Sequence, residues 1–233
     1  MEHAIPCYIY IVLSRTETGF ARTLRSLGHL NYSHSAISLD KDLRELYSFA
    51  RSEQYGLLTA RLVHETTDRY LVNAKNDIPI RVYRIPVTQQ QHDWVRKTIH
   101  EIKDDPKYIY NFLSVLTYPL FGGFSTYKAF SCSEFVAYVL KNLGYTLHKP
   151  QSHYRPDDLQ FLLEDHLCYD GKLLEYSPVR TTSDTYFRPF SMQLLNASMM
   201  VVLILLRRVI PVIFHCRSRF YRPVIIECEK QGM

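Results

Sequence analysis

A short run of β-branched and aromatic residues near the start of the chain constrains the fold more than any other feature of the sequence. The run is Tyr8-Ile9-Tyr10-Ile11-Val12-Leu13, and a turn-like segment follows it at 14–19. A run of this length and composition predicts a buried strand. The 233 residues, of which 46% are hydrophobic, suffice to build a core around it. This composition is ordinary for a globular protein and excludes disorder as the main state.

The segments that follow predict further strands and helices of an α+β domain. A short helix is expected from Phe20 to the region of Gly28. Residues 32–39 then alternate between small or polar and apolar side chains, which is typical of a strand, and a hairpin tip at 40–42 leads to a return strand at 43–49.

Two longer helices are predicted in the middle of the chain. An extended segment at 80–85 precedes Thr88, which can cap an amphipathic helix that ends at Asp104-Asp105-Pro106. The aromatic segment 108–123 contains Pro119 and a glycine pair, and it predicts a helix followed by a loop.

The C-terminal part of the chain differs in charge from the rest. The first linker-like segment lies at 178–189, so we expect one domain over 1–178 and a basic, partly apolar tail over 179–233. Residues 199–233 hold six basic and two acidic side chains, a net charge of +4, and the chain as a whole carries +5. An almost neutral domain with a small basic tail does not indicate a nucleic-acid partner.

The tail also contains the most apolar stretch of the sequence, at 199–206, followed directly by Arg207-Arg208. If 194–214 crossed a bilayer, the two arginines would lie in mid-span at a cost of about 2.5–3.5 kcal/mol each, which disfavours a true span. Two interpretations stay open: a last helix and strand packed on the domain, or an interfacial segment that makes peripheral membrane contact through 199–222.

The five cysteines favour a reducing compartment. Their number is odd, none lies in a C-x-x-C motif, and no secretory pattern precedes them. We therefore expect free thiols and a cytoplasmic protein, with the membrane as an alternative location. The His and Cys residues lack the paired short spacings of a zinc site, so no metal or cofactor is expected. The sequence does not indicate an oligomeric state.

Cys132 is the cysteine with a chemically distinctive setting. In Ser131-Cys132-Ser133-Glu134 the serine and the glutamate stand in the relation of a capping box, which places Cys132 at the first position of a helix. A thiol there faces unpaired N–H groups and the positive end of the helix dipole, which lower its pKa. The alternative is a small buried cysteine without a chemical role, as we expect for the other four.

A nucleophilic thiol needs a base, which is usually a histidine held by a third group. His34 is the candidate, because the predicted strand puts small residues beside it on one face; the alternative is a core or surface histidine. For the third group, a three-residue turn would pair Ser48 directly with His34, whereas a two-residue turn would place Phe49 there. Acidic alternatives, each of which can equally be a surface charge, are Asp40, Glu45 and Glu65.

Three segments together resemble a known family. Residues 32–40, 46–49 and 130–136 are similar to the permuted NlpC-type papain-like cysteine hydrolases, also called YiiX-like, in which the histidine strand precedes the cysteine helix. The resemblance covers roughly 8–165. It implies a papain-like α+β fold in which the helix of Cys132 packs against an antiparallel sheet that carries His34.

The resemblance also implies an activity. Members are hydrolases or acyltransferases that act on amide or ester bonds in peptidoglycan peptides or lipids. We expect Cys132 to attack a carbonyl, His34 to take and return the proton, and backbone amides near Cys132 to hold the oxyanion. Ser48 replaces a glutamate that relatives often carry, and a serine cannot stabilise an imidazolium as a carboxylate does. Two alternatives are therefore open: a catalytically weak or inactive binding module, and a membrane-surface protein whose main role lies in the tail.

Overall fold

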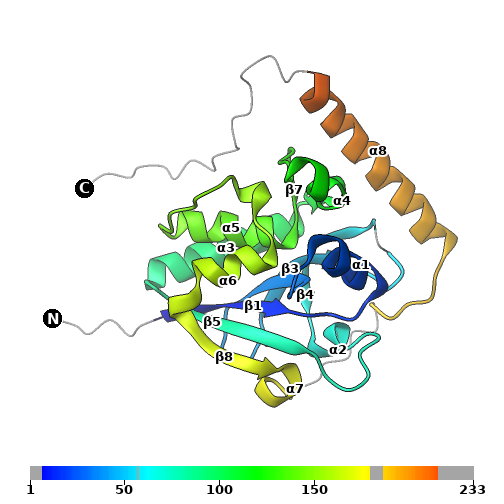
Figure 1. The fold of residues 1–233 in the computed structure, drawn as a ribbon. Coiled ribbons are helices and arrows are strands. Elements are labelled where there is room, and N and C mark those ends of the chain that lie inside the picture. The colour runs from blue at the N-terminus through cyan, green and yellow to red at the C-terminus, as the bar shows by residue number, and fades with distance from the viewer. Residues whose placement is uncertain (1–6, 57, 179–185, 215–233) are drawn as a thin grey trace.

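A six-stranded antiparallel sheet forms the centre of the protein (Figure 1). The computed structural model describes residues 7–56, 58–178 and 186–214. In spatial order the strands are β4 (Ala60–Glu65), β3 (Leu46–Arg51), β2 (His34–Ser38), β1 (Cys7–Ser14), β5 (Pro79–Val87) and β8 (Leu167–Lys172). A separate parallel pair joins β6 (Ile109–Tyr110) to β7 (Ala129–Phe130).

Helices cover the sheet, which makes the protein an α+β fold as expected. They are α1 (Gly19–Gly28), α2 (Thr67–Tyr70), α3 (Gln89–Asp104), α4 (Phe112–Phe121), α5 (Cys132–Asn142), α6 (Pro156–Leu162), α7 (Leu173–Tyr176) and α8 (Met192–Phe214), with 3-10 turns at Gln151–His153 and Glu164–His166. Figure 1 shows α3, α5 and α6 on one face of the sheet and the short α2 and α7 at the other. The helix α5 contacts β2 and β3 directly.

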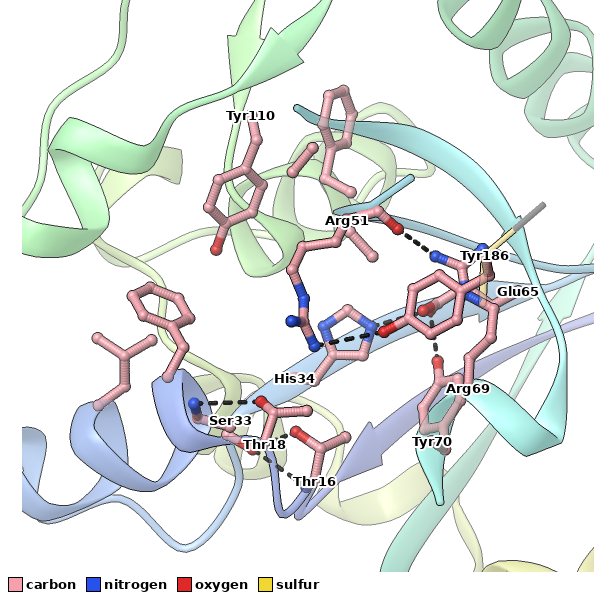
Figure 2. Close-up of a pocket in the computed structure, with 16 residues that line it drawn as sticks. Thr16, Thr18, Ser33, His34, Arg51, Glu65, Arg69, Tyr70, Tyr110 and Tyr186 are labelled. Atoms are coloured by element: carbon pink, nitrogen blue, oxygen red, sulfur yellow. Dashed lines mark hydrogen bonds and ion pairs between the residues drawn. The ribbon is translucent and has the colours of Figure 1, made fainter. Parts of the chain in front are cut away.

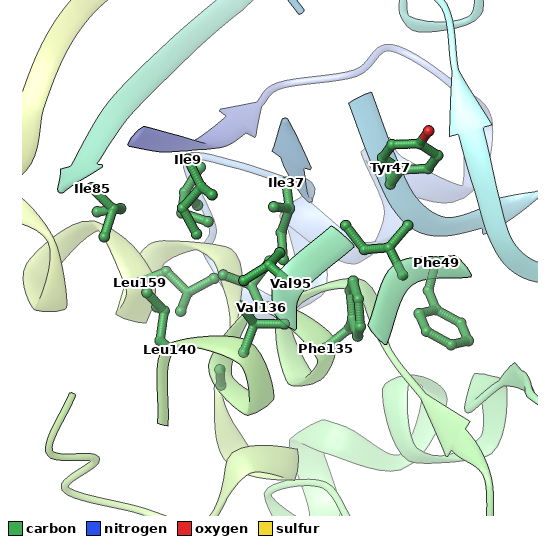
Figure 3. Packing of buried hydrophobic residues seen from close by; sticks show 14 of the residues in the cluster. Ile9, Ile37, Tyr47, Phe49, Ile85, Val95, Phe135, Val136, Leu140 and Leu159 are labelled. Atoms are coloured by element: carbon green, nitrogen blue, oxygen red, sulfur yellow. The ribbon is translucent and has the colours of Figure 1, made fainter. Parts of the chain in front are cut away.

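The central strand β1 is buried on both faces, as its sequence predicts. Ile9, Ile11 and Leu13 face the main core, where they pack with residues of α3 and α5 such as Val95 and Phe135 (Figure 3). The intervening residues of β1 belong to a second, smaller cluster on the opposite face. Because successive strand residues point to opposite faces, an uninterrupted apolar run requires a covering layer on each side.

Several predicted elements are confirmed, and the hairpin differs in detail. Thr88 caps α3 in a complete capping box. The return strand β3 begins at Leu46 and not at residue 43, because the Asp40 carboxylate accepts backbone N–H groups of the intervening turn. Leu43 has a left-handed φ of 58° in that turn, a conformation incompatible with a regular strand. The strands β4 and β8 were not anticipated.

The helix α8 packs on the domain through one side only. Leu205 lies in a small cluster with Ile109 and Ala129, and the Arg208 guanidinium donates to the carbonyl oxygens of Lys107 and Tyr127. The helix expected in the tail is therefore present, whereas the predicted final strand falls outside the described residues.

Among the described helices, one has the length and composition needed to cross a bilayer. It is the Met192–Ile210 part of α8, which has a mean hydropathy of 1.6 and is 17% buried. The arginine pair lies near the C-terminal end of this stretch and not in its middle, where the sequence analysis placed it. By length and composition this helix is compatible with membrane association.

Candidate active site

The start of α5 places Cys132 at the edge of the main core. The Ser131 hydroxyl accepts the Glu134 N–H at 3.1 Å, and the Glu134 carboxylate accepts the Ser131 N–H at 3.3 Å, so the predicted capping box is confirmed. Cys132 is thereby fixed as the first residue of the helix and is 7% exposed. Since α5 packs against β2, its first residue meets the strand that carries His34.

Cys132 and His34 lie together and change each other's protonation. Burial alone raises the pKa of the Cys132 thiol, but a hydrogen bond from His34 and the charge of the imidazolium lower the pKa below its ordinary value. A hydrogen bond from the Ser35 backbone amide adds to this effect. The two groups therefore favour a thiolate and imidazolium pair, which is the reactive form of a cysteine nucleophile.

Glu65 completes the group from the neighbouring strand β4. Its Oε2 atom lies 2.8 Å from His34 Nε2, and the Glu65 side chain is 6% exposed. Burial lowers the pKa of His34, but the Glu65 carboxylate and the bond to Cys132 raise it to about 10. Burial raises the pKa of Glu65, and the interactions with His34 outweigh this and lower the pKa to about 2. Glu65 thus balances the imidazolium charge and orients its ring.

Two hydroxyl groups hold the Glu65 carboxylate in place. Ser48 Oγ donates to Glu65 Oε2 at 2.5 Å, and Tyr70 OH donates to the same oxygen at 2.6 Å. A buried carboxylate that accepts several hydrogen bonds stays ionised and fixed in one orientation. Ser48 is therefore part of the site, where it contacts Glu65 and not His34.

The predicted direct pairing of Ser48 with His34 is wrong. The strands β2 and β3 pair Ile37 with Tyr47 and Ser38 with Leu46, a register that the longer turn imposes and that does not bring residues 34 and 48 opposite each other. Of the three acidic alternatives, Asp40 accepts backbone N–H groups of its own turn.

Glu45, another of these alternatives, forms an ion pair with Arg96 at the surface, 3.0 Å apart. Glu65 is the alternative that reaches His34. The sequence alone does not select Glu65, because β4 has no strong strand pattern and the contact depends on pairing between β3 and β4.

Tyr110 is a site residue that the sequence did not indicate. The parallel pairing of β6 with β7 sets Tyr110 opposite Phe130, two positions before Cys132. Burial raises the pKa of Tyr110 well above its ordinary value, and the neighbouring Cys132, to which it is hydrogen-bonded, raises it further. Its hydroxyl is thus a neutral hydrogen-bond donor beside the sulfur.

Two pockets adjoin this group of residues. A larger pocket of about 260 Å³ borders Cys132, and its walls are mostly apolar side chains from α1 and α4, among them Leu24, Leu27 and Val115. A smaller pocket of about 90 Å³ borders His34 and Glu65 (Figure 2). The same four residues line both pockets: Phe20, Leu24, Ser33 and Tyr110.

The other cysteines and the metal-binding residue types form no comparable site in residues 7–56, 58–178 and 186–214. Cys7 is half-buried and Cys168 is exposed, and no group of three or more His, Cys, Asp or Glu side chains is placed to hold a metal ion there. Cys216 and Cys228 lie outside the described residues. In comparisons with known proteins, no family model, curated protein or solved structure matches the chain.

Proposed function

We propose that the protein is a thiol hydrolase or acyltransferase of the permuted papain-like type, acting on an amide or ester bond through a covalent intermediate on Cys132. The observation that carries the proposal is the buried sequence of contacts from Cys132 to His34 and from His34 to Glu65. A nucleophile at a helix start, a histidine within reach and a carboxylate behind it are the parts that acyl transfer requires.

The reaction proceeds in two half-reactions. The Cys132 thiolate attacks the carbonyl carbon, the bond to the leaving group breaks, and the His34 imidazolium donates its proton to the departing oxygen or nitrogen. Water, or an alcohol or amine acceptor, then gives a proton to His34 and attacks the thioester. The carbon–sulfur bond breaks, and the thiolate and imidazolium are restored.

Donors for the oxyanion stand at the start of α5. The N–H groups of Cys132 and Ser133, the first two residues of the helix, have no partner within the helix. The Tyr110 hydroxyl lies beside the sulfur and can donate as well. Hydrogen-bond donors that are already fixed in position stabilise the negative charge that develops in the transition state, and so lower the activation free energy.

The larger pocket favours a lipid-like substrate over a peptidoglycan peptide. Its exposed walls are mostly aliphatic and aromatic side chains such as Leu24, Leu30, Phe112 and Val115, which suit an acyl chain better than the polar groups of a peptide. We therefore infer that the acyl group transferred to Cys132 is a hydrocarbon chain.

An inactive binding module is the alternative function. The sequence favoured it because a serine appeared to replace the carboxylate behind His34. The position of Glu65 supports the catalytic interpretation instead, since a carboxylate with a lowered pKa faces the imidazole.

Labelling of the thiol and turnover test the proposal together. We expect an iodoacetamide probe to label Cys132 faster than an ordinary thiol, and intact-mass analysis to detect an acyl adduct after incubation with long-chain esters or amides. Cys132→Ser should abolish both signals, whereas Cys168→Ser, which removes an exposed thiol, should leave the adduct unchanged. Turnover that survives in Cys132→Ser would contradict the proposal.

We further propose that the outer side of α8 contacts an anionic membrane surface. Six exposed apolar residues repeat along one line of this helix at intervals of three and four, over about 27 Å: Met192, Leu195, Met199, Leu203, Leu206 and Ile210. The exposed Arg207 and the net charge of +4 over 199–233 complement acidic headgroups. The cytoplasmic side of a membrane is the expected location.

Vesicle sedimentation with the full chain tests the membrane contact. We expect binding to vesicles that contain phosphatidylserine, and a loss of several-fold or more in Leu203→Gln/Leu206→Gln. Phe161→Gln removes an apolar side chain that is 76% exposed on α6 and should bind as the wild type does. If the double variant instead abolishes a dimer in solution, and the wild type does not bind vesicles, the occupant of this face is a second copy of the chain.

A further inference from the structure

The smaller pocket lies on the histidine side of the reactive pair and differs in chemistry from the acyl pocket. Its walls include His34 and Glu65 together with two arginines, Arg51 and Arg69, and the hydroxyls of Thr16 and Thr18. Figure 2 shows the Arg51 side chain extending toward His34. The apolar pocket borders Cys132 and neither of these arginines, and the arginine in its own wall, Arg155, is bonded to the Asp158 carboxylate.

The direction of the proposed reaction assigns a role to each pocket. His34 donates a proton to the leaving group, so the leaving group departs on the His34 side, while the acyl group stays on the Cys132 side. We propose that the smaller pocket is a leaving-group site that binds an anionic group, a carboxylate or a phosphate, so that the substrate is an acyl ester or amide with an anionic head. This inference rests on the proposed acyl-transfer function.

Arg51 is the residue that would bind the anion directly. In the part of the chain that the structure describes, its guanidinium hydrogen-bonds the Gln54 carbonyl through Nη1 at 2.6 Å and the Tyr186 hydroxyl through Nη2 at 3.3 Å. A guanidinium has five N–H donors in a planar fork, so donors are left for a ligand. The bonds to Gln54 and Tyr186 hold the fork in position over the pocket.

Arg69 contributes charge without being a ligand. It is 8% exposed, its Nη1 and Nη2 atoms bond the backbone carbonyls of His64 and Arg51, and the Tyr186 ring stacks on its guanidinium at 4.2 Å. Because its side chain is fixed and shielded, Arg69 raises the potential in the pocket and supports the backbone of Arg51.

The charges around the pocket leave an excess of positive charge for a ligand. Glu65 is the acidic residue in its walls, and its Oε2 atom already receives hydrogen bonds from His34, Ser48 and Tyr70. Asp68, which follows β4 and accepts from the Thr66 hydroxyl, does not line the pocket. The imidazolium, Arg51 and Arg69 carry three positive charges, against two negative charges on Glu65 and the Cys132 thiolate, so a net charge of +1 remains.

The size of the pocket suits a small head group. Its volume of about 90 Å³ has room for a carboxylate or a phosphate, since a cavity of about 10–15 Å³ on this measure holds one water. A small head with its negative charge close to the bond that breaks therefore fits this pocket.

Turnover of matched esters by the full chain tests this inference. Dodecanoyl esters of glycolate, glycerol 3-phosphate, ethylene glycol and choline share an acyl chain and differ in the charge of the leaving group. We expect kcat/KM to be about tenfold or more higher for the anionic esters than for the neutral ester, and lowest for the cationic one. The ratio between glycolate and glycerol phosphate distinguishes a carboxylate from a phosphate.

Arg51→Gln should remove the preference for anionic esters by lowering their kcat/KM about tenfold or more, toward the value for the neutral ester. Arg61→Gln on the neighbouring strand changes net charge equally at an exposed position and should keep the preference. Equal rates for neutral and anionic esters, all dependent on Cys132, would overturn the anion site and leave the proposed function intact.

A second readout does not require turnover. Iodoacetate carries the anionic group and iodoacetamide is its neutral analogue, so the ratio of their alkylation rates at Cys132 reports the local charge. We expect this ratio to fall about tenfold or more in Arg51→Gln and to be unchanged in Arg61→Gln. An unchanged ratio in Arg51→Gln would contradict the anion site even if no ester is cleaved, whereas absent labelling of Cys132 would contradict the proposed function itself.

Discussion

At the scale of residues, the site depends on one buried carboxylate, that of Glu65, and on the hydrogen bonds that it accepts. Glu65 accepts hydrogen bonds from His34, Ser48 and Tyr70 on a single oxygen. An isolated buried carboxylate would be protonated, but the imidazolium next to it and these donors keep it ionised. The same interaction raises the pKa of His34 to about 10 and lowers that of Cys132, so that the reactive thiolate is a property of the whole group.

This coupling predicts distinct pH profiles for two reactions of Cys132. Alkylation by iodoacetamide needs only the thiolate, so its rate should rise with pH, with a midpoint below that of a free thiol, and then stay level. Turnover also needs the protonated His34 as acid, so kcat/KM should fall again near pH 10, the pKa of His34 in the free protein. A kcat/KM that stays level above pH 10 would show that His34 is not the acid.

Glu65→Gln tests the carboxylate directly. Without its charge, the pKa of His34 falls and that of Cys132 rises, so the alkylation midpoint should move to higher pH and kcat should fall by about 10²-fold or more. Glu45→Gln removes a carboxylate from a half-exposed pair with Arg96 and should change neither. If the two substitutions have equal effects, Glu65 contributes to the stability of the fold and not specifically to the reactivity of Cys132.

The ion pair of Glu65 with His34 makes the free energy of unfolding depend on pH in a defined range. The folded pKa of Glu65 is about 2 against an ordinary 4.5, so its contribution is complete above pH 4.5 and is lost as pH falls toward 2. The folded pKa of His34 is about 10 against 6.5, so its contribution is complete below pH 6.5 and is lost as pH rises toward 10.

The difference in unfolding free energy between wild type and Glu65→Gln should therefore be largest between pH 4.5 and 6.5. Urea denaturation across the pH range measures it. A difference that does not vary with pH would contradict the ion pair.

The sequence predicts that Cys132 and His34 are candidate site residues but does not select the residue that lies behind the histidine. The cysteine is predictable because its capping box is local, within four residues. Glu65 is 31 residues from His34 in sequence, and its contact exists only because β3 pairs with both β2 and β4. The register of β3 depends on the turn that Asp40 organises, which an estimate of turn length does not anticipate.

At the scale of elements, the first turn of α5 both begins the helix and positions the candidate nucleophile Cys132. The capping box that begins the helix also sets the position of Cys132 against β2. The helix α3 begins with the same motif, in which Thr88 is the cap, and it lies away from the site. In the described part of the chain, α3 and α5 thus begin with a capping box built on Thr or Ser, and the box of α5 precedes the candidate nucleophile.

Ser131→Ala and Thr88→Ala separate these two functions. Each should lower the free energy of unfolding by about 1 kcal/mol, the usual effect of losing a cap. Only Ser131→Ala should also slow the alkylation of Cys132 and reduce kcat, because the first turn of α5 loosens. If Thr88→Ala reduces reactivity as much, the effect comes from lower stability and not from the position of the thiol.

The sequence predicts those helices and strands whose pattern lies within a few adjacent residues. The strand β1 and the caps of α3 and α5 carry their information in adjacent residues. In β4 the alternation of buried and exposed side chains is imperfect, with Arg61 and His64 exposed. The segment forms a strand because its backbone pairs with the edge of β3. Pairing between strands overrides a weak local preference.

At the scale of the whole molecule, α8 has one side packed on the domain and one side exposed. One side of the helix packs on the β6 and β7 pair through Leu205, and the other side exposes a line of apolar residues. A helix that lay free in solution would not form bonds to the domain, and one buried in the core would not expose Met199 or Leu203. The arrangement fits a helix that stays attached to the domain while it contacts another surface.

Two adjacent arginines allow the two sides of α8 to be tested separately. The Arg208 guanidinium donates to the carbonyls of Lys107, Tyr127 and Lys128, whereas Arg207 is exposed. Arg208→Gln should lower the free energy of unfolding by about 1–2 kcal/mol, because charge-assisted hydrogen bonds to the domain are lost.

Arg207→Gln makes the same change of charge one residue earlier and should leave stability within about 0.5 kcal/mol. It should instead weaken binding to phosphatidylserine vesicles, by about 1 kcal/mol at low salt, because the outer charge faces the headgroups. Urea denaturation and vesicle sedimentation of both variants measure the two effects. Loss of vesicle binding in Arg208→Gln alone, with Arg207→Gln unchanged, would mean that α8 meets the membrane through the side that packs on the domain, and would refute the division of roles between the two sides of the helix.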